Sequence, residues 1–459
     1  MTGPGEDPYK VEAGADKRLF VSMLIRDIEL IPAVIDLVDN SVDGARATSP
    51  GNLSKHSIEL TVLPERFEIK DDCGGIDLNI ARHYAFRFGR PKDYDGVEGS
   101  VGQFGVGMKR ALFKLGNNFE VESRTSSTAF SLPVNVSDWL EDENSDWQFK
   151  MSSVDEKYNP AEGGVGTTIR VSELHETVRE DFANSRIGSQ LKEQLRLRHQ
   201  SILSQGLKMT LNGEVLRPSS QALLSGAEFS PINRRFVVTV DGGDVLVRIV
   251  AGIAASGSNE NADDGDAEEF KGGNDAGWWI FCNDRLLIFA DRTSLTGWGD
   301  PAPAYHPQYR RFRGYVYLSA SKPDLLPWNT TKTGVDQDSR VWRRVQSEIK
   351  VSLGQVVSAL NRLKNERESG EDLDETPISA ALSKAKPVPL DDLPSQSALH
   401  APSPRRLPRP IPRRRSTQKV QYDVELDRYR EVFDLTDATS AADVGRRTFD
   451  YFYEREVEE

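Results

Sequence analysis

The change from helical to strand-like spacing of apolar residues between residues 20 and 171 constrains the fold most strongly. From Phe20 to Arg46 apolar residues recur at helical spacing, interrupted by Pro32, which predicts two consecutive helices or one kinked helix. Beyond Arg46 strand-like alternation predominates, with one further helical segment. The predicted strands are 58–62, 67–69, 119–122 and 167–171, and the predicted helix is 108–115. This pattern predicts an α/β sandwich built around one sheet.

A second, strand-rich unit is predicted to begin near Ser185, where a helical pattern resumes and further strand patterns follow it. Asn212-Gly213 and the segment 241–244 are turn signals of two hairpins. The predicted elements are strands at 207–215, 236–240, 245–250, 277–289 and 312–318, and helices at 191–203 and 340–363.

The last part of the chain differs in composition. Residues 366–419 are rich in Pro, Ser and, near their end, Arg, which predicts a disordered linker. Residues 420–459 carry seven aromatic residues, which predicts one or two helices that dock on the body or on a partner, the second capped by Ser440 with Asp443. The chain is therefore expected to be α+β, with a sandwich at 1–184, a strand-rich unit at 185–365, a linker at 366–419 and a helical segment at 420–459.

Composition excludes several classes of protein. The longest apolar runs, such as Trp278–Cys282, are far shorter than the roughly 20 residues that a membrane helix needs. The start of the chain lacks the features of a secretory signal, so we expect a cytoplasmic protein without a membrane partner. Two cysteines, Cys73 and Cys282, cannot form a disulfide framework or a four-thiolate zinc site. The net charge of -13 disfavours coating of nucleic acid by the whole surface but permits a local basic patch.

The first polar cluster lies on the predicted N-terminal helix. Asp36, Asn40 and Asp43 occupy positions i, i+4 and i+7, so they share one helical face. The amide oxygen of Asn40 suits Mg²⁺, which prefers oxygen ligands. Asp36, one turn earlier, could take a proton from an attacking water. The alternative is a solvent-facing acidic stripe.

The second cluster, Asp71-Asp72-Cys73-Gly74-Gly75, directly follows a predicted strand. An acid at a strand end can accept a hydrogen bond from the amino group of a base, and glycines let the backbone approach a flat ring. The alternative is an ordinary turn.

The third cluster is a glycine-rich stretch that runs from Gly102 through Gly105 and Gly107 into a helix that begins with Met108-Lys109. Glycines before a helix N-terminus expose backbone N–H groups that can hold phosphates, and Lys109 adds a cation. The Gly-Lys-Ser/Thr ending of a P-loop is absent, and no strand directly precedes the glycines as in a dinucleotide fingerprint.

In this order and spacing, the three clusters and Gly166-Thr167-Thr168-Ile169 resemble the motifs of the GHKL ATPases, which include gyrase, MutL, the ninety-kilodalton heat-shock chaperone, MORC proteins and histidine kinases. The resemblance covers roughly residues 17–175 and implies binding of ATP with Mg²⁺. It makes Asn40 the Mg²⁺ ligand and Asp71 the adenine-binding acid, with Gly75 approaching the adenine and Thr168 supporting the base edge. The implied phosphate-binding residues, under a lid at 89–101, are Gly102, Gly105, Gly107 and Lys109.

Two residues depart from the pattern of this superfamily. Its general base is usually glutamate where this chain has Asp36, and the shorter side chain is expected to slow hydrolysis without stopping ATP binding. Cys73 stands where glycine is frequent, which is tolerated if that residue needs no positive φ. We interpret Cys73 as a buried small apolar residue beside the nucleotide rather than a reactive thiol.

The strand-rich unit resembles the transducer domain of the gyrase, MutL and MORC branch, and the segment 277–288 followed by Trp298 resembles MORC proteins more weakly. Histidine kinases have a phosphoacceptor helix before the ATPase domain, and only 19 residues precede Phe20, so we expect the chain to belong to another branch. In the transducer branch a loop lysine reaches the γ-phosphate, and the segment 326–334 makes Lys332 the candidate here. The alternative is a solvent-facing loop lysine.

These resemblances imply an ATPase that acts as an ATP-driven clamp and forms a homodimer when ATP binds. The clamp would act on DNA in genome maintenance or defence, with Arg405 to Arg415 as the candidate contact to phosphates. The alternative for this stretch, slightly favoured, is a solvated linker. Two alternatives remain: chaperone-like remodelling of a protein, or an ATP-sensing adaptor with little turnover that signals to a protein partner through residues 420–459.

Overall fold

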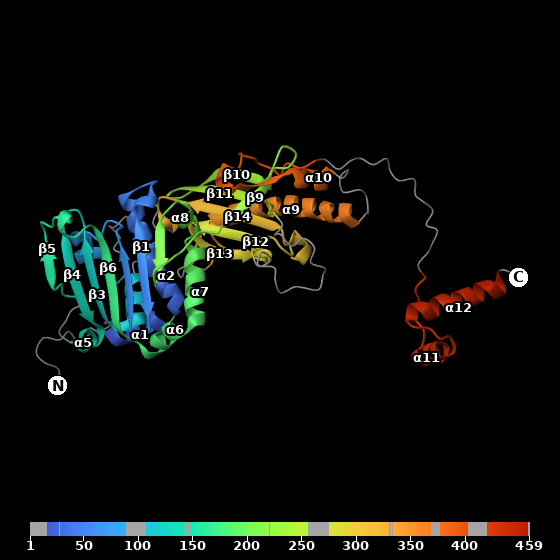
Figure 1. Ribbon diagram of the computed structural model, residues 1–459, viewed down its shortest axis with the longest axis horizontal. Helices are drawn as coiled ribbons and strands as arrows, with labels where there is room; N and C mark the ends of the chain where they lie inside the picture. Colours follow the sequence, from blue (N-terminus) through green and yellow to red (C-terminus); the bar gives the residue numbers. More distant parts are fainter. Residues whose placement is uncertain are drawn as a thin grey trace, which may run out of the picture. The chain divides into compact units, whose positions relative to one another are not determined.

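The computed structural model describes residues 16–26, 28–88, 107–142, 147–219, 221–255, 275–329, 332, 334–368, 377–402 and 420–457. These residues form helices and two large sheets, so the fold class is α+β, as predicted (Figure 1). They fall into two compact units, within residues 1–403 and 404–459. None of the described helices is long and apolar enough to cross a lipid bilayer.

The first sheet has eight strands in the order β5-β4-β3-β6-β2-β1-β7-β8, and only β1 and β7 run parallel. Val34 and Val38 of α2 share one core with Phe67 and Val171 of this sheet, which makes the predicted α/β sandwich. The strands are β1 (Ser57–Leu63), β2 (Arg66–Asp71), β3 (Gly116–Arg124), β4 (Ala129–Asn135), β5 (Ser153–Asp155), β6 (Gly166–Leu174), β7 (Lys208–Leu211) and β8 (Glu214–Val215). The helices are α1 (Lys17–Arg26), α2 (Leu30–Thr48), α3 (Leu78–Ile80), a π-helix (Ala81–Ala85), α4 (Gly107–Leu115), α5 (Val136–Glu141), α6 (Glu176–Ala183), α7 (Ser185–Arg198) and α8 (Gln200–Ser204).

The first helical region is divided into two helices, α1 and α2, which is one of the two predicted arrangements. The break precedes Pro32, which lies in the first turn of α2. A proline is tolerated there because the first N–H groups of a helix have no intrahelical acceptor.

The predicted boundary between residues 184 and 185 is wrong, because the segment that follows it belongs to the first sheet. β7 pairs with β1, and Leu195 and Met209 are buried in the same core as α2. The local pattern correctly predicted the β7–β8 hairpin around Asn212-Gly213. Local patterns do not reveal which strand a hairpin joins, so the segment was placed in the wrong unit.

The second sheet has five strands in the order β10-β11-β14-β12-β13. Helix α9 covers one face, where Val345, Ile349 and Leu353 pack with Val247 and Val316, and Figure 1 shows this helix in orange beside the sheet. The elements are β10 (Ile232–Val240), β11 (Gly243–Ile253), β12 (Gly277–Cys282), β13 (Arg285–Asp291), β14 (Phe312–Ser319) and α9 (Arg340–Glu368). Short 3-10 helices lie at Leu53–Lys55, Pro160–Glu162, Ser294–Thr296, Pro307–Tyr309, Pro323–Leu325 and Leu390–Asp392.

Part of the predicted linker at 366–419 is folded, which corrects that prediction. Residues 377–402 contain α10 (Pro377–Lys384) and β15 (Lys386–Pro389), and β15 pairs with β9 (Ala222–Ser225) in a two-stranded sheet. Ile378 and Leu390 are buried there. Prolines indicated a linker, but proline is compatible with an edge strand such as β15. Residues 403–419, with Arg405 to Arg415, lie outside the described residues.

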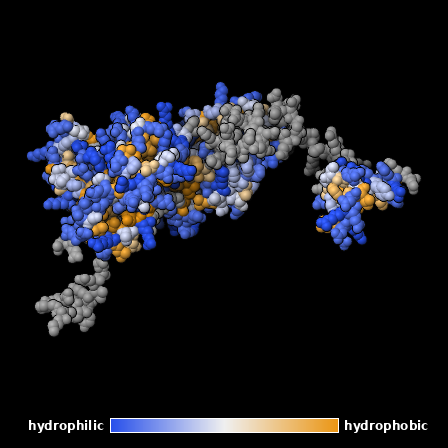
Figure 2. Space-filling model, turned by 60° about the horizontal axis from the view of Figure 1, so that its bottom comes forward, coloured by the Kyte–Doolittle hydropathy of each residue, from blue (hydrophilic) through white to orange (hydrophobic). Residues whose placement is uncertain are grey.

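The C-terminal unit consists of α11 (Leu426–Leu435) and α12 (Ala441–Glu456). The side chain of Ser440 accepts a hydrogen bond from the Asp443 N–H, as the predicted cap requires. Among the described residues of this unit only Ala438 and Val444 are buried hydrophobics. Figure 2 shows apolar side chains on its surface, and the exposed ones include Leu435, Phe449, Tyr451 and Phe452.

Candidate functional site

The polar face of α2 is built from a different set of residues than the sequence indicated. Asp36, Asp39 and Asp43 are buried, whereas Asn40 is exposed. The solvent-facing acidic stripe considered as an alternative is therefore excluded for the three aspartates. The Asn40 amide has no hydrogen-bond partner among the described residues, so its oxygen is open to a ligand such as Mg²⁺.

Asp36, the predicted general base, lies among cations. Its Oδ2 accepts a hydrogen bond of 2.8 Å from Nη2 of Arg110, which belongs to α4. Arg285 Nη1 lies 3.7 Å and Lys332 Nζ 4.0 Å from the other carboxylate oxygen, Oδ1. Asp36 is therefore already paired with a cation in this structure.

Asp39 connects the same helix to the second sheet. Its Oδ2 forms an ion pair with Arg285, the first residue of β13, and lies 3.5 Å from Lys332 Nζ. His199, which follows α7, approaches Oδ1 through Nε2 at 3.2 Å. Burial lowers the pKa of Lys332 to about 8. The structure thus brings Lys332 to the acids of α2, although the rest of its loop is only partly described.

A second link joins the C-terminal end of α2 to the second sheet. Arg46 Nη2 donates to Asn283 O at 2.6 Å and to Asp284 Oδ2 at 2.9 Å. Asn283 and Asp284 form the left-handed turn between β12 and β13, directly before Arg285. Ser201 of α8 donates to the other Asp284 oxygen at 2.7 Å. One turn of the second sheet therefore contacts both ends of the acidic face of α2.

Asp71, the predicted adenine-binding acid, is held at the end of β2 by three donors. Ser41 Oγ donates to Oδ2 at 2.6 Å, and the N–H groups of Cys73 and Thr167 donate to Oδ1 at 2.9 and 3.1 Å. Burial raises the pKa of Asp71 above its ordinary value. Two carboxylate oxygens have about four acceptor positions, so one remains for a ligand amino group.

Thr168 was predicted to support the base edge, but the threonine at Asp71 is Thr167. In the register of β2 and β6, Lys70 lies opposite Thr168 and Ile69 opposite Ile169. The contact with Asp71 is made by the backbone N–H of Thr167, and the role of Thr168 at the base edge stays a prediction.

Gly74 and Gly75 both have the left-handed backbone that favours glycine, with φ of 99° and 72°. A Cβ on Gly75 would lie 2.2 Å from Arg124 O, so the chain has no space for a side chain there. Cys73 is buried, and burial raises the pKa of its thiol. It is not among the described non-glycine residues with positive φ, in agreement with our interpretation of Cys73 as a small apolar residue.

The predicted phosphate-binding residues are only partly described. Gly102, Gly105 and the predicted lid at 89–101 lie outside the described residues. Gly107 begins α4, and a Cβ there would lie 3.2 Å from Asp36 Oδ2. Lys109 Nζ donates to Ala85 O at 2.9 Å, and burial lowers its pKa to about 7. In this conformation Lys109 supports the π-helix at 81–85.

Sequence reasoning missed four side chains of this site: Asp39, Ser41, Arg110 and Arg285. Asp39 lies three residues after Asp36 and four before Asp43, so helical periodicity could have indicated it, whereas no such spacing indicated Ser41. Arg110 follows Lys109 and could have been considered as the second cation of α4. No sequence pattern around Arg285 marks it, because it contacts Asp39 only when the two distant segments pack together.

Comparison with known proteins identifies an ATPase-type domain in the N-terminal part of the chain. Residues 28–161 match the family model described as histidine kinase-, DNA gyrase B- and HSP90-like ATPase. The match contains α2, the Asp71 turn and α4, but neither Lys332 nor Arg285. No curated protein matches the chain.

Proposed function

We propose that this chain, which carries a GHKL-type ATPase domain at 28–161, is a Mg²⁺-dependent ATPase in which the second sheet supplies a cation to the reaction. The position of Lys332 carries this proposal, since its Nζ lies 3.5 Å from Asp39 and 4.0 Å from Asp36 on the helix of Asn40. A cation at this point would stabilise charge that develops on the transferred phosphoryl group.

Each residue of the site has a role in this proposal. Asp71 and the Thr167 backbone orient the adenine edge, and the N-terminus of α4 at Gly107 faces the phosphates. Asn40 would hold Mg²⁺, which would neutralise charge on the phosphates when bound. Asp36 accepts the proton of the attacking water once Arg110 releases it.

The larger proposal is an ATP-driven clamp that forms a homodimer and acts on DNA. The contacts of Arg46 with Asp284 and of Asp39 with Arg285 support it, because they connect the nucleotide helix to the second sheet. The basic stretch from Arg405 to Arg415 would bind DNA phosphates. Chaperone-like remodelling would use the same coupling and be indifferent to DNA.

A second candidate is an ATP-sensing adaptor with little turnover. The Asp36–Arg110 pair favours it, because the base is neutralised and is also shorter than the usual glutamate. The exposed aromatic residues of α12, such as Phe449 and Phe452, would then contact a protein partner.

Phosphate release from Mg²⁺-ATP by the purified chain tests these proposals, with Asn40→Ala as the control and with and without duplex DNA. Turnover that disappears in Asn40→Ala supports the ATPase, and stimulation by DNA that weakens with salt supports the DNA clamp. ATP binding with no turnover above Asn40→Ala would overturn hydrolysis and leave the adaptor. Sedimentation with a non-hydrolysable ATP analogue tests the homodimer, and a monomer at all concentrations would overturn the clamp.

A further inference from the structure

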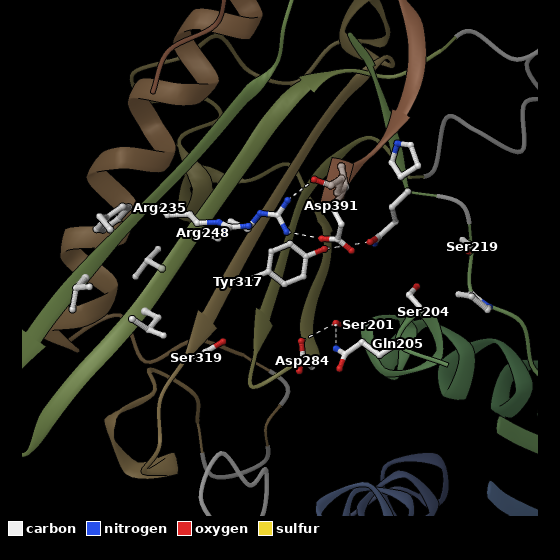
Figure 3. Close-up of a pocket in the computed structure, with 18 residues that line it drawn as sticks. Ser201, Ser204, Gln205, Ser219, Arg235, Arg248, Asp284, Tyr317, Ser319 and Asp391 are labelled. Carbon is white, nitrogen blue, oxygen red and sulfur yellow. Dashed lines mark hydrogen bonds and ion pairs between the residues drawn. The ribbon is translucent and has the colours of Figure 1, made fainter. Parts of the chain in front are cut away.

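A pocket of about 940 Å³ lies between α8 and the second sheet, on the face of the sheet opposite α9 (Figure 3). Strands β10, β11 and β14 form one side, and Ser201, Ser204 and Gln205 of the α8 region form the other. Its volume falls within the range of small-molecule sites. None of the residues assigned to the nucleotide lines it.

Two arginines lie next to each other on the sheet side of this pocket. Arg235 of β10 and Arg248 of β11 are directly opposite in the strand register, and Figure 3 shows both side chains on this face. Like charges at opposite positions of a strand pair destabilise the sheet unless they are compensated. If one of the two arginines has no carboxylate partner within the chain, an anionic ligand could pair with it.

Arg248 is compensated within the chain. Its Nη1 donates to Asp391 Oδ1 at 2.7 Å and its Nε to Asn233 Oδ1 at 3.0 Å, and Nη2 contacts Leu390 O. Arg235 is exposed and has no carboxylate within ion-pair distance in the described part of the chain. One guanidinium group in the pocket is therefore left without a matching charge.

The carboxylate of Asp284 does not supply that charge, although it also lines the pocket. It is held by Arg46 at 2.9 Å and by Ser201 at 2.7 Å. The Tyr317 hydroxyl, on the next strand, donates to Gln221 at 3.2 Å. The pocket therefore keeps an excess of positive charge at Arg235.

An apolar area adjoins the arginines. Val237 and Leu246 are opposite each other in the strand register, two residues along from Arg235 and Arg248, and both line the pocket. They are 52% and 59% exposed, so together they form an exposed apolar area beside the two arginines. A ligand with an apolar part would remove this surface from water.

We propose that this pocket binds a small organic anion whose carboxylate or phosphate group pairs with Arg235 and whose apolar part covers Val237 and Leu246. The pocket also borders the Asp284–Arg46 contact, so its ligand would lie beside the link between α2 and the second sheet. The proposal concerns binding only and does not depend on ATP hydrolysis.

Ligand-observed NMR with phenyl phosphate, without ATP, tests the proposal. Arg235→Gln is expected to weaken binding about tenfold, since a charge-assisted hydrogen bond is lost. Arg343→Gln, an exposed arginine of α9, is the matched control and should leave binding unchanged. Neutral benzyl alcohol should bind more weakly than phenyl phosphate. Equal binding of phenyl phosphate to both variants would overturn the proposal.

A blocking experiment separates this pocket from the nucleotide site. Cys73 and Cys282 are buried, so a maleimide should label Ser204→Cys selectively. The labelled side chain would fill the pocket and abolish phenyl phosphate binding, whereas labelled Ser347→Cys on α9 should not. Binding that survives the label at residue 204 would place the anion elsewhere and overturn the proposal.

Discussion

Arg110 Nη2 donates a 2.8 Å hydrogen bond to Asp36 Oδ2, so the acid that we propose as the general base is ion-paired with its neighbour on α4. The pair is nearly buried, with side-chain exposures of 16% and 6%. An ion pair of this kind is screened little by solvent and has to open before Asp36 can accept a proton.

Asp36→Asn is therefore expected to lower phosphate release by about 100-fold while ATP affinity changes little, because general bases typically contribute at least this factor. Arg110→Gln should raise phosphate release, since it frees the carboxylate. Single-turnover assays and isothermal titration separate the two effects. Unchanged turnover in Asp36→Asn would exclude Asp36 as the base.

Lys332→Met is expected to lower phosphate release by about 100-fold, which is the usual effect of removing one group that stabilises a transition state. Its pKa is lowered to about 8 by burial, so the ammonium loses its proton and its charge as the pH rises through that value. Turnover of the unmodified chain should fall above about pH 8, and the remaining turnover of Lys332→Met should not. Lys322→Met, an exposed lysine nearby, is the control. The same alkaline decrease in both proteins would assign it to another group.

The sequence predicted the helices and strands around the nucleotide well, because residue spacing along one element determines which face a side chain occupies. The roles of Asp71, Gly75 and Lys332 came from the resemblance to the GHKL ATPases and stay predictions. The backbone contact of Thr167 with Asp71 was not predicted, because it depends on the pairing of β6 with β2 rather than on the spacing within one strand.

Contacts between distant parts of the chain could not be predicted in this way. Arg285 meets Asp39 only because the β12–β13 turn packs against α2, and no periodicity encodes that contact. The folded segment at 377–402 was assigned to a linker for a related reason. Its strand, β15, is completed by pairing with β9, which is far away in the sequence.

Gly75→Ala and Gly51→Ala form a matched pair of variants. Together they separate the loss of stability caused by a steric clash from the loss caused by a left-handed backbone. Their φ values are 72° and 75°, but a Cβ at Gly51 would meet nothing within 4 Å, whereas at Gly75 it would lie 2.2 Å from Arg124 O. Gly51→Ala should cost only the roughly 1 kcal/mol of a left-handed alanine. Gly75→Ala should destabilise the chain more and also weaken ATP binding. Urea unfolding and ATP titration measure both effects, and equal destabilisation would show that the Arg124 contact relaxes.

Lys109→Met tests whether burial of this lysine lowers the stability of the fold and whether the lysine binds the phosphates of ATP. Burial lowers its pKa to about 7 from the ordinary 10.5, so between these values the unfolded chain binds a proton that the folded chain does not. Stability of the unmodified chain should therefore rise with pH across this range, and the full cost of the buried charge is present below pH 7. Lys109→Met removes that cost, so its Tm should exceed that of the unmodified chain by roughly 5 °C at pH 6.5, and the difference should shrink by pH 10.

Lys157→Met, an exposed lysine, should show neither change. A lower Tm at both pH values would mean that the Lys109–Ala85 hydrogen bond outweighs the cost of burial, and a loss of ATP affinity would assign Lys109 to the phosphates.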